Sequence, residues 1–144
     1  MERQCSKNIS RLKILIYEYV SGGGYAEQPL PPSVLAEGYA MLRGLIADFK
    51  AAGHEISVLL DERISRFDAS LDADLVIPVC HSEEPEKIIT AISKMNDAMY
   101  IIAPETSRIL EEKVKLIEQT GKMSLNSKSN AISQVANKTS LYET

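Results

Sequence analysis

Apolar positions along the chain follow two periods, a short one typical of strands and a longer one typical of helices. Four short apolar runs predict strands over residues 12–20, 54–60, 74–79 and 98–103. The first run is apolar without clean alternation. That pattern is expected of a central strand whose two faces are both covered.

Helical spacing dominates between these strands. Apolar residues recur every three or four positions at Leu35, Tyr39, Leu42, Ile46 and Phe49. This stripe predicts a helix with Ser33 as its N-cap and Gly53 just past its end. Further helices are expected from about residue 83, over residues 107–120, and from Ser127 or Ser129 toward residue 142, with a short helical turn near Phe67.

The alternation of strands and helices predicts an α/β fold. We expect a Rossmann-like, open sheet of four parallel strands in the order 3-2-1-4, with helices on both faces and right-handed crossovers. This order places a switch point between the first and fourth strands, where open sheets bind ligands. Residues 1–10 are polar and predict a disordered tail, residues 11–124 form the expected α/β domain, and residues 125–144 form a closing helical segment.

Composition narrows the class of protein. The 144 residues suit one domain, with 44% hydrophobic and 25% charged residues. The net charge of -4 argues against general nucleic-acid binding, which requires a basic face. No apolar run approaches the roughly 20 residues of a membrane span, and the N-terminus lacks the apolar core of a signal peptide. Cys5 and Cys80 are therefore expected as free thiols of a cytoplasmic protein, and no Cys/His cluster has zinc spacing.

The candidate binding residues follow the first and fourth strands. The loop after the first strand contains Ser21, Gly22, Gly23 and Gly24. Its backbone N–H groups can approach a ligand closely because glycine has no Cβ; the alternative is a flexible turn, since neither GxGxxG nor a P-loop is present. Glu105, after the fourth strand, would orient a substrate amine, a ribose hydroxyl or an amide, or else simply lie near a helix N-terminus. We expect these residues to bind substrate.

For the other polar residues near the same rim, the sequence indicates a function less clearly. His81 would bind or transfer a proton, but no partner is identifiable and a surface histidine is the alternative. Cys80 has no neighbouring base except His81, so a buried thiol is expected. Asp61 and Glu62 are typical of solvated loop acids. No catalytic or metal-ligating residue is assigned.

Two segments of the chain resemble a known family. Residues 12–42 are similar to the start of archaeal ATP-grasp ligases of the tyramine–glutamate ligase type, which carry an E-(F/Y)-V-(S/T)-G-G-G loop and an L-x-x-E-G-x-x-M-L helix. The matching positions are Glu18, Val20, Ser21, Gly22, Gly23, Gly24, Leu35, Glu37, Gly38, Met41 and Leu42. Residues 101–142 resemble the family's fourth strand, its Pro-Glu-Thr turn and its closing helix, with Asn126 and Asn137 in place of the usual glycine and aspartate.

The resemblance implies the N-terminal pre-ATP-grasp domain of a carboxylate–amine ligase, of the tyramine–glutamate or carbamoyl-phosphate-synthase-like type. In the parent enzyme, ATP and Mg²⁺ convert a carboxylate into an acyl phosphate, which an amine then attacks. The resemblance puts Lys138 against the ATP phosphates, and the glycine loop and Glu105 on the substrate side. The ATP-grasp lobes would follow residues 125–144, so this chain is expected to be inactive alone and to bind neither ATP nor Mg²⁺ tightly.

Two alternatives stay open beside this hypothesis. One is a free-standing Rossmann-like module that binds a nucleotide or sugar at the glycine loop. The other is an oligomerising domain, for example a homodimer formed through the last helix, which light scattering would detect. The sequence identifies neither the carboxylate nor the amine of the parent enzyme.

Overall fold

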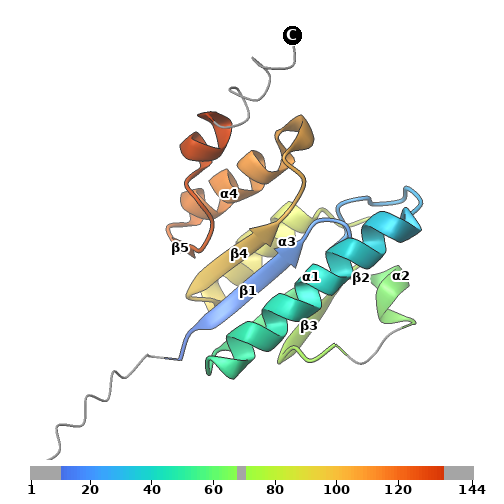
Figure 1. Ribbon diagram of the computed structural model, residues 1–144, viewed down its shortest axis with the longest axis horizontal. Helices are drawn as coiled ribbons and strands as arrows, with labels where there is room; N and C mark the ends of the chain where they lie inside the picture. The colour runs from blue at the N-terminus through green and yellow to red at the C-terminus, as the bar shows by residue number, and fades with distance from the viewer. Residues whose placement is uncertain (1–10, 68–70, 135–144) are drawn as a thin grey trace, which may run out of the picture.

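The computed structural model describes residues 11–67 and 71–134. Within them, five parallel strands form one sheet in the order β3-β2-β1-β4-β5. The strands are β1 (Lys13–Glu18), β2 (Glu55–Asp61), β3 (Leu75–Val79), β4 (Ala98–Ile102) and β5 (Met123–Ser124) (Figure 1). The predicted parallel α/β class and the order of the first four strands are confirmed, whereas the predicted count of four strands is wrong.

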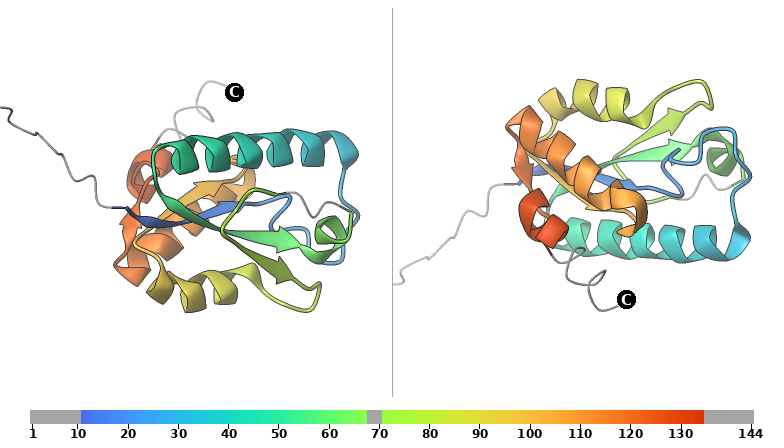
Figure 2. Two further views of the ribbon diagram at one scale, coloured as in Figure 1. Left: turned by 90° about the horizontal axis from the view of Figure 1, so that it is seen from below. Right: turned by 90° about the horizontal axis from the view of Figure 1, so that it is seen from above.

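Helices cover both faces of this sheet. On one face α1 (Pro32–Ala51) packs on β1 and β2, and on the other lie α3 (Pro85–Ile92) and α4 (Ile109–Thr120) (Figure 2). The shorter helices are α2 (Glu62–Ser65), η1 (Ser93–Met95) and η2 (Thr106–Arg108). None of the helices in the described part of the chain has both the length and the apolar character needed to cross a bilayer.

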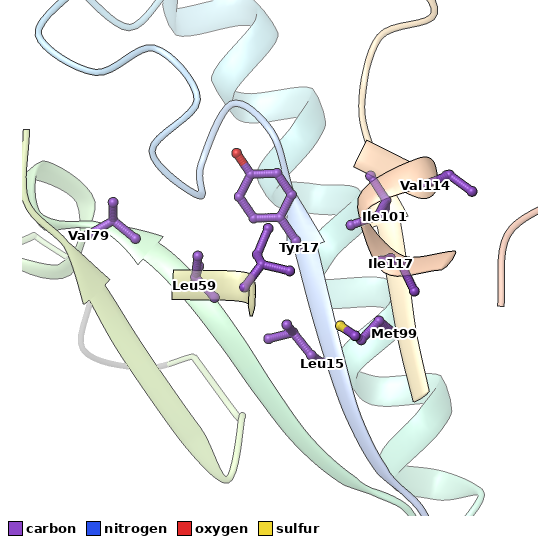
Figure 3. Packing of buried hydrophobic residues seen from close by; sticks show 9 residues of the cluster. Leu15, Tyr17, Leu59, Val79, Met99, Ile101, Val114 and Ile117 are labelled. Carbon is purple, nitrogen blue, oxygen red and sulfur yellow. The ribbon is translucent and has the colours of Figure 1, made fainter. Parts of the chain in front are cut away.

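The core lies on both sides of β1 because successive side chains of a strand point to opposite faces. Leu15 and Tyr17 belong to the cluster beneath α3 and α4, together with Leu59, Val79, Ile89, Met99, Ile101, Val114 and Ile117 (Figure 3). Ile14 and Ile16 belong to the cluster beneath α1, together with Leu42, Ile46, Ile56, Val58 and Ala98. The predicted burial of the central strand on both faces is confirmed.

The strand β5 is a two-residue edge strand that the apolar pattern does not reveal. Its main chain pairs with Ala98 and Met99 of β4. The Asn126 side chain then continues this pairing, because the N–H of Ile101 donates to Asn126 Oδ1 and Asn126 Nδ2 donates to the carbonyl of Ile101, both at 2.8 Å. The polar segment after Gly121 therefore joins the sheet through main-chain and amide hydrogen bonds, without apolar alternation.

Two helices begin at residues that differ from the predicted ones. α1 begins at Pro32 with Pro31 as its N-cap, and no side chain caps it, so the prediction of Ser33 as N-cap is wrong. Proline at the first helical position suits this geometry because its φ is already close to the helical value. α4 begins at Ile109 rather than at Ser107, which has a positive φ of 56°.

Both ends of the chain fall outside the part that the structure describes. The predicted tail over residues 1–10 lies there, and so does the closing helix after residue 134. Residues 129–134 are helical, at the place predicted for the start of that closing helix.

Candidate functional site

Glu18 is the last residue of the central strand, and its side chain is buried with 2% exposure. Its carboxylate accepts three hydrogen bonds from the turn that follows β1. The N–H of Val20 donates to Oε1 at 3.0 Å, and the N–H and hydroxyl of Ser21 donate to Oε2 at 2.7 and 2.5 Å. The chain therefore turns around a buried carboxylate at the carboxyl end of the sheet.

Helix α1 makes room for this carboxylate at Gly38. A Cβ at position 38 would lie 2.6–2.8 Å from the carboxylate atoms of Glu18. Such a distance is shorter than non-bonded atoms tolerate, so only glycine lets the helix approach so closely. Two positions that are 20 residues apart in the sequence thus serve one contact.

A pocket of about 200 Å³ opens beside this carboxylate, and we call it the Glu18 pocket. Its lining residues come from β1, α1 and β4 with their adjoining turns: Glu18, Val20, Val34, Glu37, Gly38, Met41, Ile102, Ala103 and Pro104. β1 and β4 pair in parallel, and the N–H of Tyr19 donates to the carbonyl of Ile102 at 2.8 Å beyond the pairing. The pocket therefore lies at the predicted switch point, where open α/β sheets bind ligands.

The three glycines of the loop after β1 are packed against the rest of the chain. A Cβ at Gly22, Gly23 or Gly24 would meet its nearest neighbour at 2.5, 2.7 or 2.4 Å, respectively. Gly23 also has a φ of 94°, which side chains disfavour. The N–H of Gly22 donates to the carbonyl of Glu18, and that of Gly24 to the carbonyl of Tyr19. Close packing and backbone conformation therefore explain these glycines, and their contact with a substrate stays a prediction.

An ion pair between the buried Asp61 and the partly exposed Arg63 fixes the remainder of this long loop. Asp61 ends β2 with 3% exposure and accepts hydrogen bonds from Nε and Nη2 of Arg63 at 3.0 and 2.8 Å. The same guanidinium donates to the carbonyls of Ala26 and Gln28 at 2.8 and 2.7 Å. The interpretation of Asp61 as a solvated loop acid is therefore wrong, because its charge is buried and holds the arginine that clamps the loop.

The other predicted site residues are not gathered around the Glu18 pocket. Pro104 lines the pocket, but Glu105 beside it is exposed and is the N-cap of η2. Lys138 lies outside the described residues. Substrate contact by Ser21 and Glu105, and nucleotide contact by Lys138, stay predictions.

Comparison with known proteins assigns this chain to a family. Residues 54–132 match the family model of the pre ATP-grasp 3 domain. The chain belongs to this family. A crystal structure of an ATP-grasp superfamily protein from Archaeoglobus fulgidus is similar, with a TM-score of 0.65 and 25% identity, over 85% of this chain and 35% of that one. The chain thus spans about a third of the length of that protein, and no curated protein matched it.

A second polar cluster of the pre-ATP-grasp domain lies at the carboxyl ends of β2 and β3. His81 Nδ1 lies 3.1 Å from Glu62 Oε1, so Glu62 is the partner that the sequence did not identify. The hydrogen bond with His81 lowers the pKa of Glu62. Burial, followed by the charge of Glu62, raises the pKa of the half-buried Cys80 thiol. Because the thiolate is the nucleophile, the raised pKa lowers the fraction of Cys80 in the nucleophilic form.

The described residues of the pre-ATP-grasp domain do not form a site for a metal ion or a phosphate chain. No group of three or more His, Cys, Asp or Glu side chains among them is placed to hold a metal ion. The N–H groups of Ser21, Gly22 and Gly24 donate to atoms of the chain itself, so this loop is not arranged as a phosphate cradle.

Sequence reasoning did not select Glu18 and Gly38 as site residues, although both belong to the motif that carries the resemblance. The available signal was a single acid in the strand sequence KILIYE. Buried acids require partners, so an acid in an otherwise apolar central strand points to a specific environment. The glycine partner could not be found in the same way, because its role depends on the tertiary contact between α1 and β1.

Proposed function

We propose that this chain is the N-terminal, substrate-side domain of an ATP-dependent carboxylate–amine ligase of the tyramine–glutamate ligase type. The observation that carries the proposal is the match of residues 54–132 to the pre ATP-grasp 3 family. The similarity to a longer ATP-grasp superfamily protein supports a role as one part of a larger enzyme. The resemblance of residues 12–42 to the start of such ligases supports the N-terminal position.

The chemistry proposed for the longer enzyme is activation of a carboxylate as an acyl phosphate by ATP and Mg²⁺, followed by amide formation with an amine. This domain would bind and orient one of the two substrates at the switch-point rim. The Glu18 pocket offers a partly open volume there, and the turns that carry Ser21 and Glu105 follow the same two parallel strands. Because the reaction consumes ATP, a cytoplasmic location is expected.

The proposal is tested by measuring ADP release from the full-length protein with panels of carboxylates and amines in the presence of Mg-ATP. ADP formation should require one member of each panel, and mass spectrometry should detect the corresponding amide. The 144-residue chain alone should release no ADP in the same assay. A Lys138→Ala variant of the full-length protein should raise the apparent KM for ATP if this residue contacts the nucleotide.

Calorimetry of Mg-ATP binding to the 144-residue chain tests the alternative of a free-standing nucleotide-binding module. Micromolar binding of Mg-ATP, or turnover by this chain, would contradict a substrate-side domain and would favour the free-standing nucleotide-binding module. ADP release by the full-length protein without any amine would contradict the ligase reaction itself.

A further inference from the structure

The Glu18 carboxylate is buried without a compensating positive charge among the described residues. Its hydrogen-bond donors are the uncharged N–H groups of Val20 and Ser21 and the Ser21 hydroxyl. The other buried carboxylate at this rim, that of Asp61, has the guanidinium of Arg63 at 2.8 Å. Burial of an ion without a counter-ion is costly, so a carboxylate in this environment favours binding of a cation.

The carboxylate also retains unused acceptor capacity. An ionised carboxylate offers about four lone-pair sites on its two oxygens. Oε2 accepts two hydrogen bonds from Ser21, whereas Oε1 accepts one from Val20. Because Glu18 lines the pocket, a donor that enters the pocket lies beside a carboxylate whose Oε1 accepts a single hydrogen bond from the described residues.

The other residues that line the Glu18 pocket indicate which class of ligand would fit it. The second charged residue is another acid, Glu37, which is exposed, and no basic side chain lines the pocket. The other lining side chains are apolar: Val20, Val34, Met41, Ile102, Ala103 and Pro104. Two acids on an apolar wall favour a cation that carries a hydrocarbon body, and they disfavour an anion or a neutral sugar.

Size and donor chemistry distinguish an organic cation from a metal ion. A volume of about 200 Å³ is below the range of roughly 300–1,000 Å³ for drug-sized ligands, so the pocket suits a small molecule. Metal ions such as Mg²⁺ or Ca²⁺ require about six oxygen ligands, whereas this wall is mainly hydrocarbon. An ammonium group needs only a few acceptors and tolerates an apolar neighbour.

We propose that the Glu18 pocket binds a small primary amine in its protonated form, with the ammonium on the Glu18 carboxylate and the hydrocarbon body against Val34 and Met41. This inference rests on the proposed function, and it assigns the amine, rather than the carboxylate substrate, to this domain. Glu37 at the mouth would attract the cation before it enters the pocket.

The test is an NMR titration of the 144-residue chain at pH 7 with three ligands of similar shape, namely benzylammonium, benzyl alcohol and benzoate. Benzylammonium should shift the amide signals of Val20, Gly38 and Ala103, which surround the pocket. Benzyl alcohol should bind at least about tenfold more weakly, which corresponds to 1.4 kcal/mol, and benzoate should not bind. Equal binding of the alcohol or the benzoate, or no benzylammonium binding at millimolar concentration, would overturn the proposal.

A pair of lysine substitutions on α1 separates the pocket from general surface charge. Met41 and Ala40 are both exposed on this helix, but only Met41 lines the pocket. Met41→Lys places an ammonium of the chain itself at the site and should abolish benzylammonium binding. Ala40→Lys adds the same charge and should bind as the unsubstituted chain does. Equal affinities of the two variants would overturn the assignment of the site.

A variant of the carboxylate itself gives an independent readout. Glu18→Gln removes the charge but keeps an oxygen that can accept from Ser21, and its amide spectrum reports whether the fold is retained. A folded Glu18→Gln chain should lose benzylammonium affinity at least about tenfold, and unchanged affinity would overturn the proposal. If this variant does not fold, the lysine pair decides. Failure of all these tests with normal ADP release by the full-length protein would remove the amine pocket while leaving the proposed ligase function intact.

Discussion

Two glutamates of this chain each accept the N–H and the hydroxyl of one serine, and they differ in their surroundings. Glu18 accepts the N–H and the hydroxyl of Ser21 at 2.7 and 2.5 Å. Glu118 of α4 accepts the N–H and the hydroxyl of Ser129 at 2.8 and 2.7 Å. The first pair is buried at the carboxyl end of the central strand, whereas the second is exposed where the chain leaves α4 and enters the last described helix.

Hydrogen bonding to a serine explains how each glutamate orients the chain, but it does not explain why one of the two carboxylates is buried. Both glutamates fix the direction of the chain, but only the donors bound by Glu18 would otherwise lack partners, because water can reach those of Ser129. Only the exposed pair keeps its charge in contact with water, which costs little. The buried pair holds a charge away from water, and the serine does not neutralise it. The burial of Glu18 therefore has to be explained either by a ligand that binds there or by a large contribution of Glu18 to the free energy of unfolding.

The largest effect that tests this comparison is expected from Glu18→Ala. The substitution leaves the donors of Val20 and Ser21 buried without their acceptor, at about 1–3 kcal/mol for each unsatisfied group. We expect the free energy of unfolding in urea to fall by about 3 kcal/mol. The matched Glu118→Ala change exposes its donors to water and should cost about 0.5 kcal/mol. Equal losses for the two variants would show that burial does not distinguish the pairs.

The next effect is expected from Arg63→Met, which turns Asp61 into a second buried carboxylate without a cation. Removing one partner of a buried pair costs about 3–5 kcal/mol. Because the Arg63 side chain is 34% exposed, we expect a smaller loss of about 2 kcal/mol. Hydrogen exchange should also become faster near Ala26 and Gln28, whose carbonyls lose their donor. An unchanged stability would indicate that this rim tolerates an unpaired carboxylate, and it would weaken the argument made for Glu18.

A smaller effect is expected from Gly38→Ala, which presses a methyl group against the Glu18 carboxylate. Overpacking costs about 1–3 kcal/mol, and the higher helix propensity of alanine returns about 1 kcal/mol. The net loss in chemical denaturation should therefore be about 1 kcal/mol. Gly44→Ala on the same helix is the control, since its Cβ meets nothing within 4 Å, and it should raise stability by about 0.5–1 kcal/mol. Stabilisation by both changes would contradict the contact between α1 and Glu18.

The smallest effect concerns pH and the exposed pair. Hydrogen bonds from the N–H and then the hydroxyl of Ser129 lower the pKa of Glu118. Its contribution to stability is thus complete above the ordinary glutamate pKa of about 4.3 and is lost as the pH falls through the lower folded value. The Ser129 amide signal should follow this titration in NMR spectra. A Glu118→Gln chain should show no such transition, and a transition that persists in it would assign the effect to another group.

Most of the fold followed from periodicity. The apolar runs around Ile14, Ile56, Val76 and Met99 marked four strands, and the alternation with helices fixed their order, because parallel crossovers leave few arrangements. β5 escaped this reasoning because a two-residue strand has no period, and because the contact with β4 is continued beyond it by the side chain of Asn126. The N-cap of α1 was misplaced by two residues, at Ser33 instead of Pro31, because a proline can begin a helix without a capping side chain.

The site was only partly accessible from the sequence. Parallel topology correctly placed the turn after β1 and the turn at Pro104 on one rim. The reason for the glycines at that rim could not be predicted, because it depends on tertiary contacts. The three glycines of the loop pack against Val79 and the rings of Tyr17 and Tyr19. The same holds for Asp61, whose sequence neighbour Arg63 becomes its partner only through the geometry of the turn that begins α2.

The Asn126 amide has a consequence for how this sheet meets other chains. An open edge presents free N–H and C=O groups to which a foreign strand can add. At Ile101 both groups are already taken by the asparagine side chain. A foreign strand therefore finds no free main-chain group at Ile101, where β4 would otherwise be open beyond the short β5.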